Sequence, residues 1–203
     1  QKKIYFMKEN LLINLVFCVS RKKECLDTNR ISNLNNSIKY AINHINNIKI
    51  YVHIYDDSFG SVCKPIIDKY QEEHDFISTH VTNKKGKYEA LIYHLNHRKS
   101  DRVIFTDANT YFLKDSIYNL IQSMLDTNKA VIAGRLMHLS DRDFDKISNS
   151  LDSKYFNDIQ KEDSKTRSTN NFFKSLEDFF NITAGVNGAF YMINPKFFLN
   201  RIH

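Results

Sequence analysis

The sequence predicts an α/β protein with a largely parallel sheet flanked by helices. Two observations support this fold class. Short apolar runs typical of buried strands alternate with longer segments whose apolar residues recur at helical spacing. The 203 residues are 42% hydrophobic and 26% charged, a composition typical of a globular protein with a core. Such an alternation is usual for parallel strands joined by helical crossovers.

The first predicted strand and helix lie near the start of the chain. The apolar run LLINLVFCV predicts a strand from about Leu12 to Ser20. The run is too short to cross a bilayer and contains Asn14, so a buried strand is favoured. Asp27 and Thr28 are candidate caps of the following helix. The apolar residues of that helix are Ile31, Leu34, Ile38, Ala41 and Ile45.

The second and third strands follow with a helix between them. In IKIYVHIY (48–55) small apolar residues alternate with polar or aromatic ones, and the run ends at the polar segment DDSFGS. FISTHV (76–81) predicts the third strand, and NKKGK (83–87) predicts a basic turn after it. The helix between the two strands carries Ile66, Ile67 and Tyr70.

The rest of the sheet is predicted from three further apolar runs. YEALIYHL (88–95) predicts a helix and RVIFT (102–106) the fourth strand. AVIAG (130–134) predicts the fifth strand, and ITAGVNGAFYMI (182–193) returns the chain to strand. The helix between the fourth and fifth strands carries Ile117, Leu120, Ile121 and Met124.

Residues 139–180 interrupt this alternation. They are rich in Asp, Lys, Ser and Asn, with aromatic residues interspersed. We interpret them as an insertion of polar helices or a lid, and a solvated surface excursion is the alternative. We expect one domain over residues 1–203 that contains this insertion.

The polar candidates for a functional site follow four of the predicted strands. Ligands of open parallel sheets collect at the carboxyl ends of the strands, because backbone donors, helix N-termini and loop side chains meet there. The candidates are Ser20 and Arg21 after the first strand, Asp56 and Asp57 after the second, Gly86 and Lys87 after the third, and Asp107 and Asn109 after the fourth.

Several of these candidates also have a structural explanation. Asp56 and Asp57 could instead cap the next helix, and Lys87 could be a solvated turn lysine. For Asp107 a ligand-binding role is favoured, because the helix that follows should begin only near Lys114 to Ser116.

Composition and motifs argue against several other functions. The net charge of +6 is scattered among acidic residues, so a nucleic-acid surface is not expected and an anionic small ligand is favoured. Cys18, Cys25 and Cys63 are odd in number and lack CxxC spacing, which argues against a disulfide framework and a zinc site. The pair His94 and His97 lacks the glutamate of HExxH, so surface histidines are favoured.

No glycine-rich phosphate loop of the GxGxxG or GxxxxGK type is present, and Ser58 and Ser61 lie in no nucleophile elbow. Carboxylates beside lysines at the mouth of a parallel sheet fit instead a ligand with a diphosphate, held through a divalent cation.

The ordered motifs resemble those of family 2 glycosyltransferases. The matching pieces are INLVFCVSRKKE, IKIYVHIYDDSFGS, NKKGKYEAL, VIFTDANTYFLKDSI, and the two later strands VIAGRL and TAGVNGAFYMI, which together span about residues 12–195. The resemblance implies a GT-A type, Rossmann-like fold, with a nucleotide-binding part over about 12–136 and a returning strand over about 182–193.

Residue roles follow from the same resemblance. It implies that Asp56 or Asp57 contacts the base or ribose of the donor, with Ser20, Gly86 and Lys87 lining the same pocket. Asp107 would hold the ribose and diphosphate side and, with Asn109, the metal, as the two ends of a DxD-type motif. An amide oxygen is a weaker ligand than a carboxylate, which weakens the expected grip on the metal.

The implied activity is inverting transfer of a hexose or hexosamine from a nucleotide-diphosphate sugar, a UDP-sugar in our expectation, to a glycan acceptor in polysaccharide biosynthesis, with Mn²⁺ or Mg²⁺. The family's acidic base follows the glycine-containing strand, so we expect it beyond His203. The pair Glu177 and Asp178 precedes that strand. A non-catalytic nucleotide-sugar-binding domain is the alternative, and a nucleotidyltransferase is a third possibility.

The sequence leads us to expect the protein in the cytoplasm, at the inner face of the membrane if it is associated with the membrane. No signal peptide is visible, and the three cysteines form no framework, which favours a reducing compartment. Membrane association is expected only through parts outside this chain.

Overall fold

The computed structural model describes residues 10–19, 28–57, 64–81, 86–108, 110–127, 129–134 and 190–199. Strands and helices alternate as the sequence predicts, and the expectation of an α/β protein is confirmed. The strands are β1 (Leu11–Val19), β2 (Ile48–Asp56), β3 (Ile77–Val81), β4 (Arg102–Asp107), β5 (Val131–Ala133) and β6 (Phe190–Ile193). The helices are α1 (Thr28–His44), α2 (Lys64–Glu73), α3 (Gly86–His97), α4 (Ser116–Thr127) and α8 (Lys196–Leu199).

The six strands form one mostly parallel sheet in the order β3-β2-β1-β4-β6-β5. β1 pairs in parallel with β2 and with β4, and β2 pairs in parallel with β3. β6 lies antiparallel between β4 and β5. The strand order reverses between β1 and β4, and such a reversal is where open α/β sheets bind ligands.

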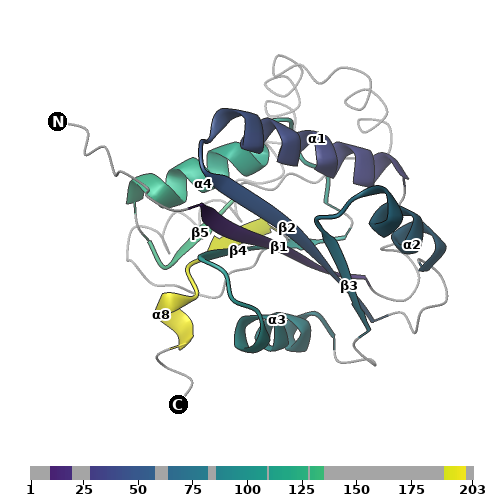
Figure 1. Ribbon diagram of the computed structural model, residues 1–203. Helices are drawn as coiled ribbons and strands as arrows, with labels where there is room; N and C mark the ends of the chain where they lie inside the picture. The colour runs from purple at the N-terminus through teal and green to yellow at the C-terminus, as the bar shows by residue number, and fades with distance from the viewer. Residues whose placement is uncertain are drawn as a thin grey trace, which may run out of the picture. The chain divides into compact units, whose positions relative to one another are not determined.

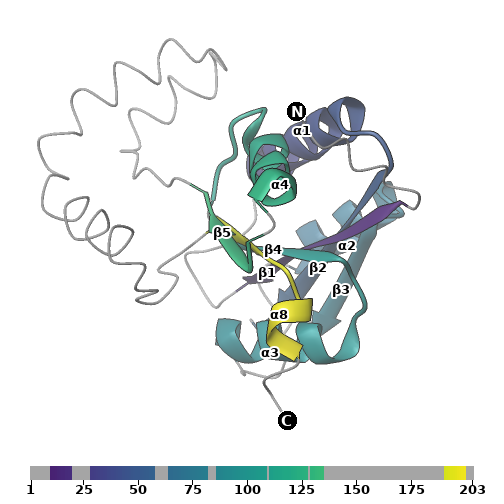
Figure 2. The same cartoon turned by 90° about the vertical axis from the view of Figure 1, so that its left-hand side faces the viewer.

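Helices cover both faces of the sheet, as Figures 1 and 2 show. α1, α2 and α4 lie on one face, where Asn35 of α1 hydrogen-bonds Tyr70 of α2 and His74, the residue that follows α2. α3 lies on the other face, over a core that includes Val16 and Phe105. β1 is buried along nearly its whole length, and its largely apolar sequence suits a central parallel strand that is covered on both faces.

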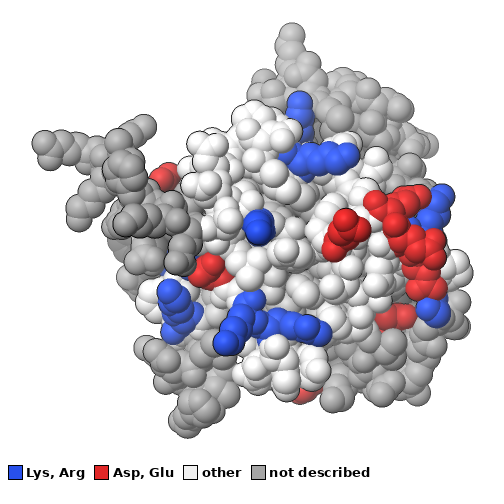
Figure 3. Space-filling model, viewed as in Figure 1, with Lys and Arg blue, Asp and Glu red and all other residues white. Residues whose placement is uncertain are grey.

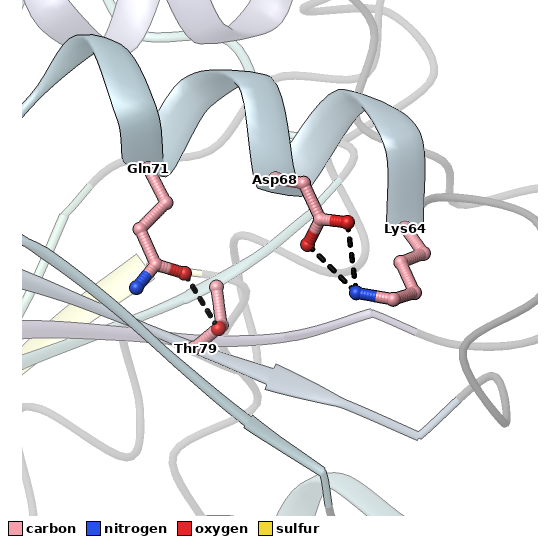
Figure 4. Close-up of polar contacts among 4 residues, drawn as sticks. All are labelled: Lys64, Asp68, Gln71 and Thr79. Carbon is pink, nitrogen blue, oxygen red and sulfur yellow. Dashed lines mark hydrogen bonds and ion pairs between the residues drawn. The ribbon is translucent and has the colours of Figure 1, made fainter.

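Two local features shape this arrangement. Asn47 has a φ of 59°, the left-handed conformation that commonly ends a helix, and it leads from α1 directly into β2. α2 is tied to the sheet by the Thr79 hydroxyl, which donates to Gln71 at 2.8 Å, while Lys64 and Asp68 form an exposed ion pair on the helix at 2.8 Å (Figure 4).

The chain divides into two units. The sheet and its helices belong to the first, Gln1–Arg135 with Gly188–His203. The second, Leu136–Asn187, contains the expected insertion at 139–180 and lies outside the described residues, so the expected domain organisation stays a prediction. No helix in the described ranges has the length and apolar character needed to span a membrane.

Element bounds differ slightly from those predicted. α3 begins at Gly86, within the segment predicted as a basic turn, and β5 is limited to Val131–Ala133. Of the predicted returning strand at 182–193, the described part is β6; residues 182–189 lie outside the described ranges.

Candidate functional site

Asp107 and Lys87 form an ion pair at the carboxyl edge of the sheet. Asp107 is the last residue of β4, and Lys87 lies in the first turn of α3. The Lys87 Nζ contacts Asp107 Oδ1, and the two side chains are 48% and 28% exposed. The end of β4 and the start of α3 thus place two side chains, twenty residues apart in sequence, in contact at a solvent-accessible position. Lys87 is therefore paired and lies in a helix rather than in a turn, although its side chain remains half-exposed.

Asp57 connects the end of β2 to the start of α3. Its backbone amide donates to the Val19 carbonyl at 3.0 Å, and its Oδ2 accepts from the Gly86 amide at 3.0 Å. A carboxylate at a helix N-terminus is stabilised by the unpaired amides and by the helix dipole. Gly86 has a φ of +76°, a conformation that glycine adopts readily.

Asp57 therefore has a capping role, but for a different helix from the one expected. α2, the next helix along the chain, begins only at Lys64, whereas α3 receives the carboxylate. Asp56 is the last residue of β2 and is 6% exposed, in register with Val19. The two neighbouring aspartates thus occupy different environments, one in the sheet and one at the start of α3.

Two aromatic residues that the sequence did not single out lie beside this ion pair. The Lys87 Nζ lies 5.7 Å from the Phe105 ring centroid, and the Phe105 and Tyr191 centroids are 5.4 Å apart. Burial, with a further contribution from the Asp107 carboxylate, raises the pKa of Tyr191 to about 12. Tyr191 therefore keeps its proton at neutral pH. Its β6 strand pairs with β4, a neighbour relation with no local signal in the sequence.

The remaining predicted site residues, Ser20 and Asn109, lie outside the described residues, as do Arg21 and the pair at 177–178. The Thr110 amide donates to the Asp107 carbonyl at 3.1 Å, so the chain turns directly after β4. α4 begins at Ser116, which confirms that Asp107 is too far away to cap it.

The described residues contain no group of three or more His, Cys, Asp or Glu that could hold a metal ion. The oxygen chemistry of Asp107 suits Mg²⁺ or Mn²⁺, and its carboxylate is accessible. The Lys87 ammonium contacts the same carboxylate, so a cation there would compete with Lys87. A divalent ion would therefore need further oxygen ligands, from residues outside the described ranges or from a bound phosphate.

The prediction of surface histidines on α3 is wrong for His94. Its side chain is completely buried. Both ring nitrogens have partners there, because Nδ1 lies 2.9 Å from the Tyr55 hydroxyl and Nε2 lies 3.1 Å from Asn14 Nδ2. Burial, followed by the neighbouring rings of His53 and His80 and by Arg98, lowers its pKa to about 3. These bonds hold α3 on the sheet and so fix the position of its first turn.

His53 belongs to the same cluster. Its Nδ1 lies 3.1 Å from His80 Nε2, and its ring centroid lies 4.7 Å from that of His94. Burial lowers the pKa of His53 to about 4, and the charges of His80 and Arg98 add to the effect. The rings of His53 and His94 are therefore neutral at physiological pH.

An open, mostly parallel sheet with carboxylates and a lysine gathered at its strand reversal belongs to the α/β proteins that bind ligands at such an edge. Residues 28–191 match the model of glycosyl transferase family 2. The chain belongs to glycosyl transferase family 2. This confirms the resemblance drawn from the motifs and, with the observed sheet, the expected GT-A type α/β fold.

Three solved structures resemble this chain at low identity. One is the mannosyltransferase PcManGT from Pyrobaculum calidifontis in complex with GDP-Man and Mn²⁺, with 16% identity, a TM-score of 0.47, and coverage of 66% of this chain and 37% of that one. Another is TarS 1–349 from S. aureus, with 15% identity, a TM-score of 0.46, and coverage of 64% and 39%.

The third is a 4-diphosphocytidyl-2C-methyl-D-erythritol synthase from Anaerococcus prevotii, with 11% identity, a TM-score of 0.45, and coverage of 66% and 61%. The chain thus spans between 37% and 61% of the length of these proteins. No curated protein matches its sequence.

Proposed function

We propose that this domain binds a nucleotide-diphosphate sugar, a UDP-sugar in our assignment, and takes part in inverting transfer of its hexose or hexosamine to a glycan acceptor. The observation that carries the proposal is the meeting of Asp57, Gly86, Lys87 and Asp107 at the strand reversal of a family 2 chain. Family membership supports a sugar transfer; the nucleotide, the acceptor and the stereochemistry are our proposal.

The described residues would divide the work of holding the donor. The Lys87 ammonium is placed to pair with a diphosphate oxygen, because it reaches the sheet edge and is only half-buried. Asp57 fixes the first turn of α3 and thereby the backbone position of Lys87. Asp107 would contact the ribose and diphosphate side of the donor. Together with Asn109 it would hold a divalent cation, Mn²⁺ or Mg²⁺. Such a cation would supply neutralisation of charge on the departing nucleoside diphosphate.

The general base is assigned to residues outside the described part of the chain. Asp57 accepts from the Gly86 amide and Asp107 pairs with Lys87, so both have structural partners already. As part of the same proposal, we place the reaction in polysaccharide synthesis in the cytoplasm, at the inner face of the membrane if the protein is associated with it. Family membership supports the sugar transfer that such a synthesis requires.

Ligand-induced stabilisation tests the donor assignment. The chain is heated with UDP, GDP or CDP, each with and without Mn²⁺, and UDP with Mn²⁺ is expected to raise the melting temperature most. A ligand at a hundred times its Kd adds about 2.7 kcal/mol to the free energy of unfolding. Asp107→Asn is expected to remove this shift.

Asp68→Asn is the matched control, because it also removes a carboxylate from an exposed Lys–Asp pair, on α2. It should leave the shift unchanged. Stabilisation by UDP that survives Asp107→Asn would refute the assigned role of Asp107, and the absence of a shift with any of the nucleotides would refute the donor assignment.

A further inference from the structure

A cavity of about 590 Å³ lies at the amino-terminal ends of β1 and β2. Its lining comes from the start of both strands and from the residues that end α3. α3 begins at Gly86 beside the Asp107 edge and, as a twelve-residue helix, is about 18 Å long. The cavity is therefore at the opposite end of α3 from that edge. Its volume falls in the range of small-molecule sites.

The floor of the cavity, formed by Asn14 of β1 and His53 of β2, is polar although these side chains lie in the interior of the sheet. Asn14 and His53 are only 3% and 8% exposed. Further along the same strands, Val16 and Tyr55 belong to the core cluster that also includes residues of α3. Buried polar groups cost free energy unless they are hydrogen-bonded. Asn14 Nδ2 lies 3.1 Å from His94 Nε2, and His53 Nδ1 lies 3.1 Å from His80 Nε2.

Three cationic side chains surround this floor: Lys49, Arg98 and Lys99. The lining contains no Asp or Glu among the residues that the structure describes, and within the same ranges none of the three cations is in an ion pair. Figure 3 shows Lys and Arg gathered where Figure 1 draws α3, and Asp and Glu gathered where it draws α2. The described lining therefore carries three positive charges and no negative one.

The end of α3 explains part of this charge. Carbonyl groups at a helix C-terminus attract cations, which accounts for Arg98 and Lys99 without a ligand. Lys49 comes from β2 and has no such explanation. Three like charges around one cavity repel each other, and a bound anion would relieve that repulsion.

We propose that this cavity binds a small soluble molecule that carries a phosphate group, at a site separate from the edge formed by Lys87 and Asp107. A phosphate ester carries between about one and two negative charges at neutral pH, which suits a cluster of cations. The planar guanidinium of Arg98 can pair with two phosphate oxygens, while Lys49 and Lys99 add point charges. The volume leaves room for a polar group beyond the phosphate on the floor.

Inorganic pyrophosphate is the probe, titrated into the 203-residue chain by calorimetry at low salt. The double variant Lys49→Gln with Arg98→Gln is expected to weaken binding about tenfold or more, because two charge-assisted contacts are lost. Both side chains are exposed, so the fold should be kept. The matched control is Lys64→Gln with Lys69→Gln, which removes two exposed lysines from α2 and should leave the affinity unchanged.

The Lys87→Met variant separates the two sites. The proposal expects it to keep the binding that the Lys49 and Arg98 changes remove. Pyrophosphate binding that disappears only with Lys87→Met would overturn the cavity site, as would equal loss in both double variants. Absence of pyrophosphate binding would also overturn it. If the chain instead binds vesicles that contain phosphatidic acid, the cavity serves a lipid surface rather than a soluble ligand, and the proposal is likewise overturned.

Discussion

The buried histidines predict an unusually steep loss of stability below pH 6.5. His53 and His94 have their pKa lowered to about 4 and about 3, mainly by burial, against 6.5 for an unfolded chain. Because the folded values are the lower ones, the stabilisation is complete above pH 6.5 and is lost as the pH falls toward the folded values. Each ring contributes a slope of about 1.4 kcal/mol per pH unit.

The slope reaches this full value only about one pH unit below 6.5, so two rings over the interval from pH 6.5 to 5 remove roughly 3 kcal/mol, a large part of the 5–15 kcal/mol that is usual for a domain. The groups facing these rings are Tyr55, His80 and Arg98, and the last two act in the same direction as burial. Few carboxylates of ordinary pKa titrate in this interval, so the histidines should dominate the slope.

The assay is urea unfolding, followed by circular dichroism, at several pH values between 7.5 and 5. His94→Gln is expected to remove about one proton from the slope, whereas His97→Gln, an exposed ring on the same helix, should leave it unchanged. If His94→Gln fails to fold, nuclear magnetic resonance of the wild-type rings replaces it. A wild-type slope near zero, or a His94 ring that titrates near pH 6.5, would refute the reasoning.

Three further predictions concern the edge and the glycines. Lys87→Met should weaken UDP binding about tenfold, as measured by calorimetry. It should change the free energy of unfolding by less than about 1 kcal/mol, because the pair of Lys87 with Asp107 is solvent-exposed, and a large loss of stability in urea unfolding would contradict this. Gly86→Ala should lower the free energy of unfolding by about 1–2 kcal/mol through its φ of +76° alone, since nothing crowds the added methyl; wild-type stability would count against this. Gly134→Ala should cost about 1–3 kcal/mol, because its Cβ would overlap the Phe190 ring, and an unchanged urea midpoint would show that the ring moves freely aside.

Local periodicity predicted the elements of the fold because each strand and helix carries its own pattern. The alternation in β2 and the helical spacing in α4 need no knowledge of neighbours, so both were found from the sequence. The position of β6 between β4 and β5 was not, because antiparallel pairing of the short Phe190–Ile193 depends on contacts far along the chain. The Tyr191 ring beside Asp107 was missed for the same reason.

The histidines show a different limit. A polar residue on a helix is usually exposed, and that rule failed for His94 because its partners, Asn14 and Tyr55, come from two separate strands. The capping role considered for Asp57 was at the next helix along the chain, whereas its carboxylate accepts from the first residue of α3. Hydrogen-bond partners that are distant in sequence leave no periodic signal, so these assignments needed the structure.

The pairing of Lys87 with Asp107 bears on how the edge would handle its ligands in the proposed function. Each group neutralises the other, since ammonium and carboxylate are in contact. A diphosphate that pairs with Lys87 releases the Asp107 carboxylate, and a cation that binds Asp107 releases the lysine. Each ligand therefore lowers the cost of admitting the other, and thermodynamic linkage requires the two effects on affinity to be equal. The same lysine that competes with a lone cation thus makes the edge favour the cation and the diphosphate together.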